Sequence, residues 1–236
     1  MSAKRLAALL LAAAALAGCG GAGGAHGRAA LWVTRDRGAE IVLDTRVGAG
    51  QTLMRALRGV AKVETRYGGR FVQGIDGIAG SRSGQRDWFW FVNGYEGDRS
   101  AAEYHLQRGD IAWFDYRSWS EEPEAPVVVG AFPEPFLHGY DGKRRVAAVR
   151  YDSPSLEGGA HAIGGLIGAD TVAPSGRPVP KDANLFLLVE GPQQFRAELR
   201  EPGAGPGSPV RFTFAGDAYA LADDPGSVAL RRFELP

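Results

Sequence analysis

The chain has little that could support disulfide, redox or metal chemistry. Its 236 residues include one cysteine, Cys19, and four histidines. A single thiol cannot form an intramolecular disulfide, so the folded state must depend on a packed core. The histidines (His26, His105, His138 and His161) are far apart and lack the spacing of zinc ligands. We therefore expect no metal site and no resident cofactor.

An excess of charge of one sign is also missing. Lys plus Arg total 27, and Asp plus Glu total 27. No long-range field would draw the chain to DNA, so nucleic acid is not an expected partner. The sequence contains no nucleophile motif of the Gly-x-Ser-x-Gly type. Asp76, Asp110 and Asp115 could pair as catalytic carboxylates, but turns and strand ends commonly carry Asp. We therefore do not expect an enzyme.

A long apolar run is present only near the N-terminus. Lys4 and Arg5 precede apolar residues 6–17, and Gly18 and Cys19 follow them. A charged start, a short hydrophobic core and small residues are typical of a secretory signal. As a helix the run would span about 18 Å, less than the roughly 30 Å of a membrane core. We expect residues 1–18 to be a signal peptide that is removed.

The sequence Leu16-Ala17-Gly18-Cys19 resembles the bacterial lipobox, whose cysteine is lipidated and becomes the new N-terminus. Acyl chains on Cys19 would hold the mature chain at a membrane. The Gly-rich residues 19–29 would form a flexible tether. This pattern predicts an extracytoplasmic, lipid-anchored protein. The alternative is an ordinary secreted protein with a stray thiol.

The remaining sequence divides into two expected domains, residues 30–122 and 127–236, because an acidic, Pro-rich linker lies between them. In the first domain, apolar periodicity predicts one helix beginning after Thr52, which would be its N-cap. Strands are predicted at 40–47, 61–66, 70–75, 87–93 and 111–117. We expect an α+β domain in which a single helix packs across a mixed sheet.

The second domain has a different pattern. Strands are predicted at 127–130, 145–151, 184–189 and 210–214. Pro154 favours the first position of a helix that continues to about Leu166, with Ser153 as its N-cap. These elements predict a small α/β or α+β unit, and they do not indicate its role.

Two strands of the first domain are unusually aromatic, at residues 88–91 and 113–116. Successive strand residues point to opposite faces, so both faces of these strands are apolar. One helix can cover only one face, and each aromatic side chain can bury roughly 150–250 Å². The second face must be covered by the second domain, by a partner protein or by a flat hydrophobic ligand.

Four short motifs surround these strands. They are Gly50-Gln51-Thr52-Leu53, Phe71-Val72-x-x-Ile75-Asp76-Gly77, Trp88-x-Trp90-x-Val92-Asn93-Gly94 and Leu106-x-x-Gly109-Asp110-x-x-Trp113-x-x-Tyr116. In order and spacing they resemble DUF4430, a domain of unknown function that is similar to the C-terminal domain of transcobalamin and intrinsic factor. Trp90 stands where a Tyr is common, and Asp87 where a Gly often precedes the Trp. The resemblance covers residues 40–117 and implies a β-grasp-like fold with a corrinoid-facing surface.

From this resemblance we expect a non-enzymatic, membrane-anchored binding module that captures a corrinoid such as cobalamin and delivers it to an uptake transporter. The flat ligand would stack on Trp88, Trp90 and Trp113. Tyr95 and Tyr104 would line the edges of the site with their hydroxyl groups, and Asn93 would form a hydrogen bond with an amide of the ligand.

A structural or adaptor lipoprotein is the alternative function. In that case the aromatic face would pack against the second domain of the same chain or against a partner protein. A further alternative is a hydrolase or transferase that acts on the cell envelope through the second domain.

Overall fold

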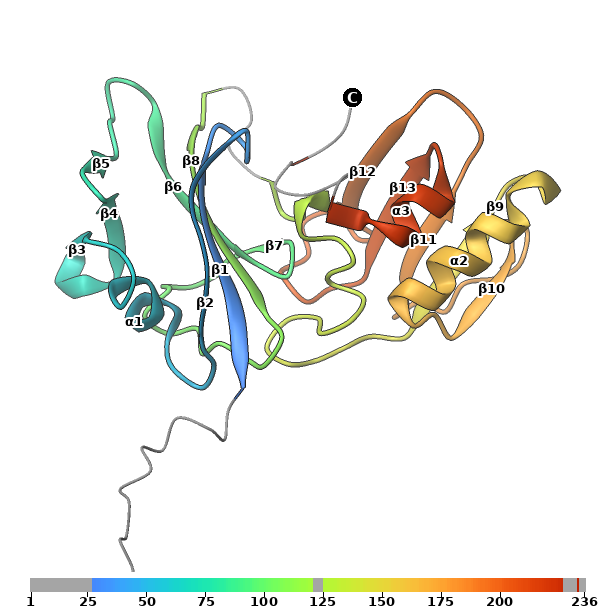
Figure 1. The fold of residues 1–236 in the computed structure, drawn as a ribbon, viewed down its shortest axis with the longest axis horizontal. Coiled ribbons are helices and arrows are strands. Elements are labelled where there is room, and N and C mark those ends of the chain that lie inside the picture. Colours follow the sequence, from blue (N-terminus) through green and yellow to red (C-terminus); the bar gives the residue numbers. More distant parts are fainter. Residues whose placement is uncertain (1–26, 121–124, 227–232, 234–236) are drawn as a thin grey trace, which may run out of the picture.

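The computed structural model describes residues 27–120, 125–226 and Phe233. The expected signal peptide, Cys19, most of the tether and the middle of the acidic linker lie outside the described residues. Within the described ranges, no helix is long and apolar enough to cross a membrane. We call residues 27–120 the N-terminal unit, and residues 125–226 with Phe233 the C-terminal unit. They lie side by side in Figure 1.

The N-terminal unit is built on a five-stranded mixed sheet of order β2-β1-β8-β6-β7. Its strands are β1 (Arg28–Arg35), β2 (Glu40–Gly48), β6 (Arg86–Val92), β7 (Tyr95–Glu96) and β8 (Ile111–Ser118). Strand β1 runs parallel to β8, and the other neighbours are antiparallel. The expected mixed sheet is therefore present. The expected tether ends earlier than residue 29, because Arg28 and Ala29 already belong to β1.

The one expected helix of this unit is α1 (Leu53–Arg58). Thr52 caps it, since its hydroxyl oxygen accepts a hydrogen bond from the Arg55 amide at 3.3 Å. A separate three-stranded sheet contains β3 (Val63–Arg66), β4 (Phe71–Ile75) and β5 (Ile78–Ala79). The unit thus has two sheets where one was expected. The α+β class is confirmed, while the β-grasp arrangement stays a prediction.

The C-terminal unit contains a second five-stranded sheet, of order β10-β9-β11-β13-β12. Its strands are β9 (Ala147–Tyr151), β10 (Thr171–Pro174), β11 (Asn184–Leu188), β12 (Gln194–Leu199) and β13 (Val210–Ala215). All neighbours are parallel except β12 with β13. The helices α2 (Glu157–Ile167) and α3 (Ala218–Asp223) pack together on one side of this sheet (Figure 1).

Two local predictions in the C-terminal unit are wrong. The expected strand at 127–130 is a 3-10 turn at Val129–Ala131, because this segment pairs with the β6–β7 turn and not with a sheet of its own unit. Ser153 does not cap α2 through its side chain. A 3-10 turn at Pro154–Leu156 separates Ser153 from the first α-helical turn. The helix therefore begins later than proline placement alone indicates.

The segment that follows the linker covers the other side of the second sheet. Val128 donates its amide to the Gly94 carbonyl at 2.9 Å, which attaches the segment to the N-terminal unit. The ring centroids of Phe132 and Phe195 lie 5.2 Å apart, as do those of Phe136 and Phe212. These residues belong to one buried cluster that includes core positions of both units. The two sheets therefore share a continuous core.

The second aromatic face of the N-terminal sheet is covered by the chain itself. Phe91 and Trp113 form a buried cluster with Ala125, Val128 and Phe233. The Phe233 ring centroid lies 5.3 Å from that of Phe91 and 5.4 Å from that of Trp113. The Phe233 carbonyl also accepts a hydrogen bond from the Val129 amide at 3.1 Å. Residues near the linker and near the C-terminus thus satisfy the need for a cover on this face.

Candidate functional site

The structure separates the three expected stacking tryptophans onto two faces of one sheet. Trp90 lies opposite Phe114 in the β6–β8 register, whereas Trp113 lies opposite Phe91 on the other face. Trp113 is fully buried, and its indole donates to the Thr34 hydroxyl at 2.7 Å. A single flat ligand therefore cannot stack on Trp88, Trp90 and Trp113 together. Trp113 belongs to the core under Phe233.

Asn93 is a buried turn residue. Its amide nitrogen donates to Asp110 at 2.8 Å and to the Gly139 carbonyl at 2.7 Å. Its oxygen accepts from the Ile111 amide at 2.8 Å. Asn93 and Gly94 both have positive φ, as a tight hairpin turn between β6 and β7 requires. The expected hydrogen bond from Asn93 to a ligand would have to replace bonds that hold this turn to the C-terminal unit.

The expected polar-tipped tyrosines are also enclosed. The Tyr104 hydroxyl donates to Asp110 at 3.2 Å, and the Tyr95 hydroxyl donates to the Ser208 carbonyl at 2.7 Å. Both side chains are almost fully buried, and burial raises the pKa of each phenol. Burial likewise raises the pKa of the Asp110 carboxyl. These residues connect β6, β8 and the C-terminal unit, and their ligand contacts stay a prediction.

Trp88 and Trp90 do meet at a cavity. It has a volume of about 430 Å³, and its apolar wall includes Tyr67, Phe71 and Phe114. Trp88 is held in place because its indole donates to the Ile78 carbonyl at 2.9 Å. The cavity therefore lies between the three-stranded sheet and strand β6, on the face opposite Phe233. We call it the aromatic cavity.

Two neighbouring hollows extend the aromatic cavity. One of about 220 Å³ shares Phe71, Trp88 and Trp90 with it and is also lined by Trp119. Another of about 410 Å³ shares Tyr67 and Phe71 and again includes Trp119. Together they form a groove whose aromatic side chains come from β4, β6 and the segment after β8.

Sequence reasoning missed Tyr67, Phe71 and Trp119 as members of this groove. Tyr67 is 74% exposed and Phe71 is 36% exposed, with their ring centroids 6.1 Å apart in an edge-on arrangement. Tyr67 precedes two glycines, and the three residues share positive φ, which points the ring outward from a turn. An aromatic residue beside a Gly-Gly turn is the signal that could have indicated it.

Gly97 allows Trp90 to line the cavity. A Cβ atom at position 97 would lie 2.1 Å from the Trp90 indole, far inside van der Waals contact. The other side of Trp90 faces Tyr104, with 5.7 Å between ring centroids. The indole is thus clamped between a glycine backbone and a buried phenol while one edge stays accessible. The cavity is therefore bounded by the edge of an indole that its neighbours hold in one position.

Charged side chains at the rim of the aromatic cavity are neutralised. Arg70 forms an ion pair with Glu103 at 2.6 Å. Arg99 pairs with Asp98 at 2.8 Å and with Asp141 at 2.8 Å. Burial pushes the pKa of Asp98 upward, but the hydrogen bonds from Arg99 and Tyr140 outweigh it, so this pKa is lowered. Each rim guanidinium group is thus paired with at least one carboxylate.

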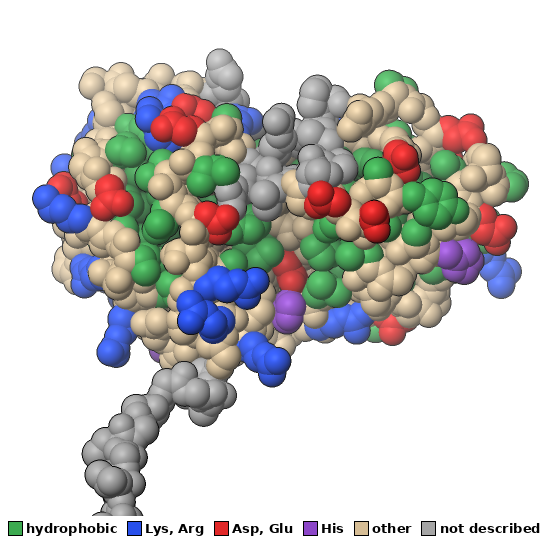
Figure 2. Space-filling model, viewed as in Figure 1, with side chains coloured by type: hydrophobic (Ala, Val, Ile, Leu, Met, Phe, Trp, Pro, Cys, Tyr) green, Lys and Arg blue, Asp and Glu red, His purple; other side chains and the backbone are tan. Residues whose placement is uncertain are grey.

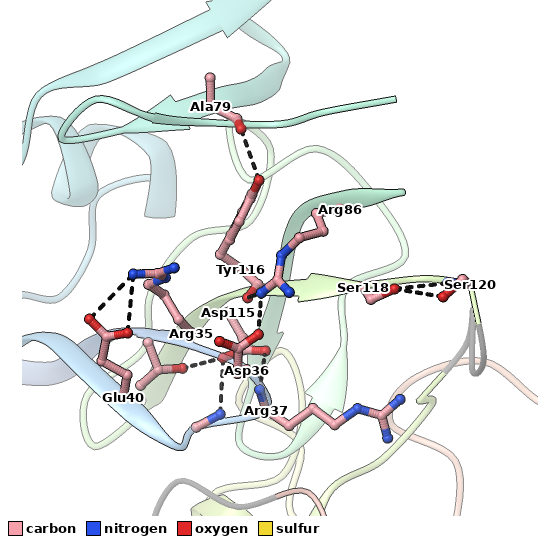
Figure 3. A network of polar contacts seen from close by, with 12 residues as sticks. Arg35, Asp36, Arg37, Glu40, Ala79, Arg86, Asp115, Tyr116, Ser118 and Ser120 are labelled. Atoms are coloured by element: carbon pink, nitrogen blue, oxygen red, sulfur yellow. Dashed lines mark hydrogen bonds and ion pairs between the residues drawn. The ribbon is translucent and has the colours of Figure 1, made fainter. Parts of the chain in front are cut away.

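A separate buried network fixes the end of the sheet (Figure 3). Asp115 accepts hydrogen bonds from the amides of Arg37 and Gly38, each at 3.0 Å, and from the Thr34 hydroxyl. Burial raises the pKa of its carboxyl despite these donors. Arg86 pairs with Asp36 above the same turn. The network ties the β1–β2 turn to β8.

The aspartates considered as catalytic carboxylates do not form a pair. Asp115 holds the β1–β2 turn, while Asp110 accepts from the Gln107 amide at 2.8 Å in a different part of the unit. Asp76 accepts from the Lys62 amide at 2.8 Å. Across the described part of the chain, no group of three or more His, Cys, Asp or Glu residues could hold a metal ion.

Comparison with known proteins finds a match to one family model in part of the chain. Residues 50–118 match the family model described as "Domain of unknown function (DUF4430)". No curated protein matches the chain.

Two solved structures are similar to about two fifths of the chain. A protein from Ruminococcus gnavus ATCC 29149, proposed to bind metal, is 17% identical, with a TM-score of 0.34, 39% of this chain covered and 97% of that one. Haptocorrin in complex with Cbi is 14% identical, with a TM-score of 0.32, 39% of this chain covered and 25% of that one. This chain therefore spans only a quarter of the haptocorrin length. Residues 50–118, which match the DUF4430 model, include β6, β8 and much of the aromatic cavity.

Proposed function

We propose that this chain is a non-catalytic ligand-binding module whose aromatic cavity holds a flat, largely apolar ligand. The observation that carries the proposal is the wall formed by Trp88, Trp90, Phe71 and Tyr67 around a space of about 430 Å³. Small-molecule sites are usually concave, mostly apolar and of this size or larger. An aromatic lining that is partly exposed without a ligand gains contact area when one binds.

The chemistry of the rim narrows the ligand class. The nearby guanidinium groups are neutralised by carboxylates, so the cavity favours a neutral ring system over an anion. Polar groups at the edge of such a ring could reach the rim carboxylates and guanidinium groups of Arg70 and Arg99. A corrinoid has this character, and it is the ligand class that the DUF4430 resemblance implies. We therefore propose a corrinoid as the ligand.

The groove leaves much of a large ligand accessible to a second protein. Its neighbouring hollows of about 220 and 410 Å³ are open depressions along β6 and β4. A corrinoid lying there would cover Trp90 and Trp119 and present its outer face. That geometry suits capture followed by delivery to an uptake transporter, which we propose as the role of the complex.

We also propose that the mature chain works outside the cytoplasm. The lipobox-like sequence that ends at Cys19 supports removal of residues 1–18 and lipidation of the new N-terminus. Acyl chains on Cys19 would keep the binding unit at the membrane where a transporter operates. Metabolic labelling with a radioactive fatty acid tests this step, and a Cys19→Ser chain should lose the label. Label retained by Cys19→Ser would refute lipidation at this residue.

Co-elution with cobalamin tests the ligand. Residues 20–236 are mixed with cobalamin and desalted, and the visible absorbance that elutes with the protein is recorded. We expect close to one corrinoid per chain. Trp90→Leu and Phe71→Ser should each weaken binding by about threefold to tenfold, the loss typical of one stacking contact.

Tyr219→Ser is the matched control, because Tyr219 is 62% exposed on α3 and lies outside the aromatic cavity. It should bind like the unaltered chain. Equal binding by Trp90→Leu, Phe71→Ser and the control would refute the aromatic cavity as the site. Circular dichroism of each variant verifies that the fold is kept.

An adaptor function is the second candidate, and one observation favours its intramolecular form. The Phe91–Trp113 face packs against Ala125, Val128 and Phe233 of the same chain. That contact explains one aromatic face without any ligand. The aromatic cavity on the other face is not used in this way, so the adaptor hypothesis predicts a protein partner there and no retained corrinoid.

A further inference from the structure

A second cavity, distinct from the aromatic one, lies within the C-terminal unit. It has a volume of about 390 Å³ and is lined by Asp141, Lys143, Arg144 and Arg145 on one side and by residues 206–208 on the other. Figure 2 shows several Lys and Arg side chains along the lower edge of one face of the molecule. We call this space the basic cavity.

The positive charges of the basic cavity are not neutralised within the described residues. Lys143, Arg144 and Arg145 form no ion pair with a described carboxylate, whereas Arg99 and Arg117 do. Asp141 lines the cavity, but its carboxylate is bound to Arg99 at 2.8 Å. In a chain with 27 residues of each sign, this is a local excess of positive charge.

The guanidinium groups are held in place by carbonyl oxygens, which fix their position without cancelling their charge. Arg144 donates to the Phe136 carbonyl at 2.9 Å. Arg145 donates to the Gly207 carbonyl at 2.6 Å and to the Asp182 carbonyl at 3.2 Å. Cations fixed before binding lose little side-chain entropy when an anion arrives. The site is therefore preorganised.

Two backbone features shape the walls of the basic cavity. Residues 141 and 142 both have positive φ in a tight turn that presents Lys143 directly beside the two arginines. Gly207 has a φ of +80°, and a Cβ atom there would approach the Tyr140 side chain at 3.3 Å. The neighbouring Ser208 adds a hydroxyl donor to the lining.

We propose that the basic cavity binds the phosphate group of a small soluble ligand. Two planar guanidinium groups and an ammonium match an anion that carries close to two negative charges and several acceptor oxygens. A recess of about 390 Å³ favours a small soluble ligand over an extended surface. Lys143, Arg144 and Arg145 do not line the aromatic cavity, so either site can fail its test without affecting the other.

Thermal unfolding with inorganic phosphate tests the proposal. A ligand that binds the folded state raises the melting temperature in a saturable way. We expect phosphate to do so at about 1–10 mM, whereas sodium chloride at equal ionic strength does not. Titration calorimetry on the same protein should give a stoichiometry near one phosphate per chain.

Variants assign the effect to the cavity. Lys143→Gln should weaken phosphate binding at least threefold, and Lys143→Gln with Arg144→Gln at least tenfold. Lys143 is exposed and makes no side-chain contact that holds the fold, so its variant folds even where the double variant does not. Lys181→Gln, a change at another exposed lysine, is the control and should bind normally. The proposal would be overturned if phosphate and chloride changed the melting temperature equally. It would also be overturned if Lys143→Gln and the control bound phosphate with the same affinity.

Discussion

Asp110 connects three parts of the N-terminal unit through one buried carboxylate. It accepts hydrogen bonds from the Asn93 amide, the Tyr104 hydroxyl and the Gln107 backbone amide. All three partners are donors, so the position requires an acceptor on both oxygens. Asp115, on β8, likewise accepts hydrogen bonds from the backbone amides of Arg37 and Gly38. At the scale of single residues, buried carboxylates position the turns that frame the site.

We predict that Asp110→Asn destabilises the protein by about 2–3 kcal/mol, because one of its two oxygens becomes an NH₂ group facing a donor. Urea unfolding at neutral pH measures the change. Asp182→Asn is the matched control, since Asp182 is exposed, and it should alter the free energy of unfolding by less than about 0.5 kcal/mol. Equal effects of the two substitutions would contradict the role assigned to Asp110.

His138 should make stability depend on pH. Its hydrogen bond to the buried Glu134 raises the pKa of the imidazole above its ordinary value. Because the pKa of His138 is higher in the folded state, the protonated imidazole stabilises the fold. This stabilisation is complete below the unfolded-state pKa, and it is lost as the pH rises through the folded-state pKa. The unaltered protein should therefore exceed His138→Gln in stability by more at pH 5.5 than at pH 9.

The difference should stay below about 1 kcal/mol, because the His138 side chain is 42% exposed and solvent screens the pair. Urea unfolding at both pH values measures it. His161→Gln on the exposed side of α2 should show no such pH-dependent difference. A stability gap between the unaltered chain and His138→Gln that widens with rising pH would refute the assignment.

At this scale the sequence could predict that the aromatic strands are apolar on both faces and that one helix covers only one of them. It could not tell Trp113 from Trp90, because both are tryptophans in aromatic strands. Only the register of β6 against β8, together with the position of Phe233, decides which face is enclosed. Phe233 lies far from Trp113 in the sequence, so residue type alone could not predict that it covers this face.

At the scale of elements, close approach between β6 and the segment after β7 shapes the aromatic cavity. We predict that Gly97→Ala destabilises the protein by about 1–3 kcal/mol, because the added methyl group must displace the Trp90 ring. It should also lower corrinoid affinity. Gly176→Ala is the control, since a Cβ atom there meets no neighbour within 4 Å. Unfolding experiments that rank the two variants as equal would contradict the proposed contact.

Elements governed by local signals were predicted well. Helix α1 has its apolar periodicity and its Thr52 cap within a few residues, and β6 and β8 are continuous aromatic runs. Strand β1 was missed, because it begins in an alanine-rich stretch and gains its place from a parallel partner far along the chain. Residues 127–130 were predicted as a strand because Val127, Val128 and Val129 are apolar and β-branched. In the structure these valines are buried, and the segment enters the 3-10 turn at Val129–Ala131.

At the scale of the whole molecule, the two units share one core. All five tryptophans lie between residues 32 and 119, so tryptophan emission reports on the N-terminal unit alone. We predict that Leu188→Ala, a fully buried change in the C-terminal sheet, lowers the unfolding midpoint seen by tryptophan emission. The expected cost of about 2–5 kcal/mol should appear equally in emission and far-ultraviolet circular dichroism.

An unchanged tryptophan midpoint in Leu188→Ala, with a separate early transition by circular dichroism, would show that the units unfold independently.

The sequence predicted a division near residue 124. It did not predict that the segment after this point joins the cores of the two units. Phe132 and Phe136 lie in a stretch with two Pro residues and no periodicity, so no secondary-structure signal marked them as core residues.

Equilibrium dialysis of residues 20–236 against cobalamin tests the central claim most directly. The aromatic cavity predicts saturable binding that approaches one corrinoid per chain, with tryptophan emission from Trp90 becoming shielded from acrylamide as the site fills. Absence of retained corrinoid at high micromolar concentrations, with the fold intact, would contradict the corrinoid assignment and leave the cavity to a different ligand or a protein partner.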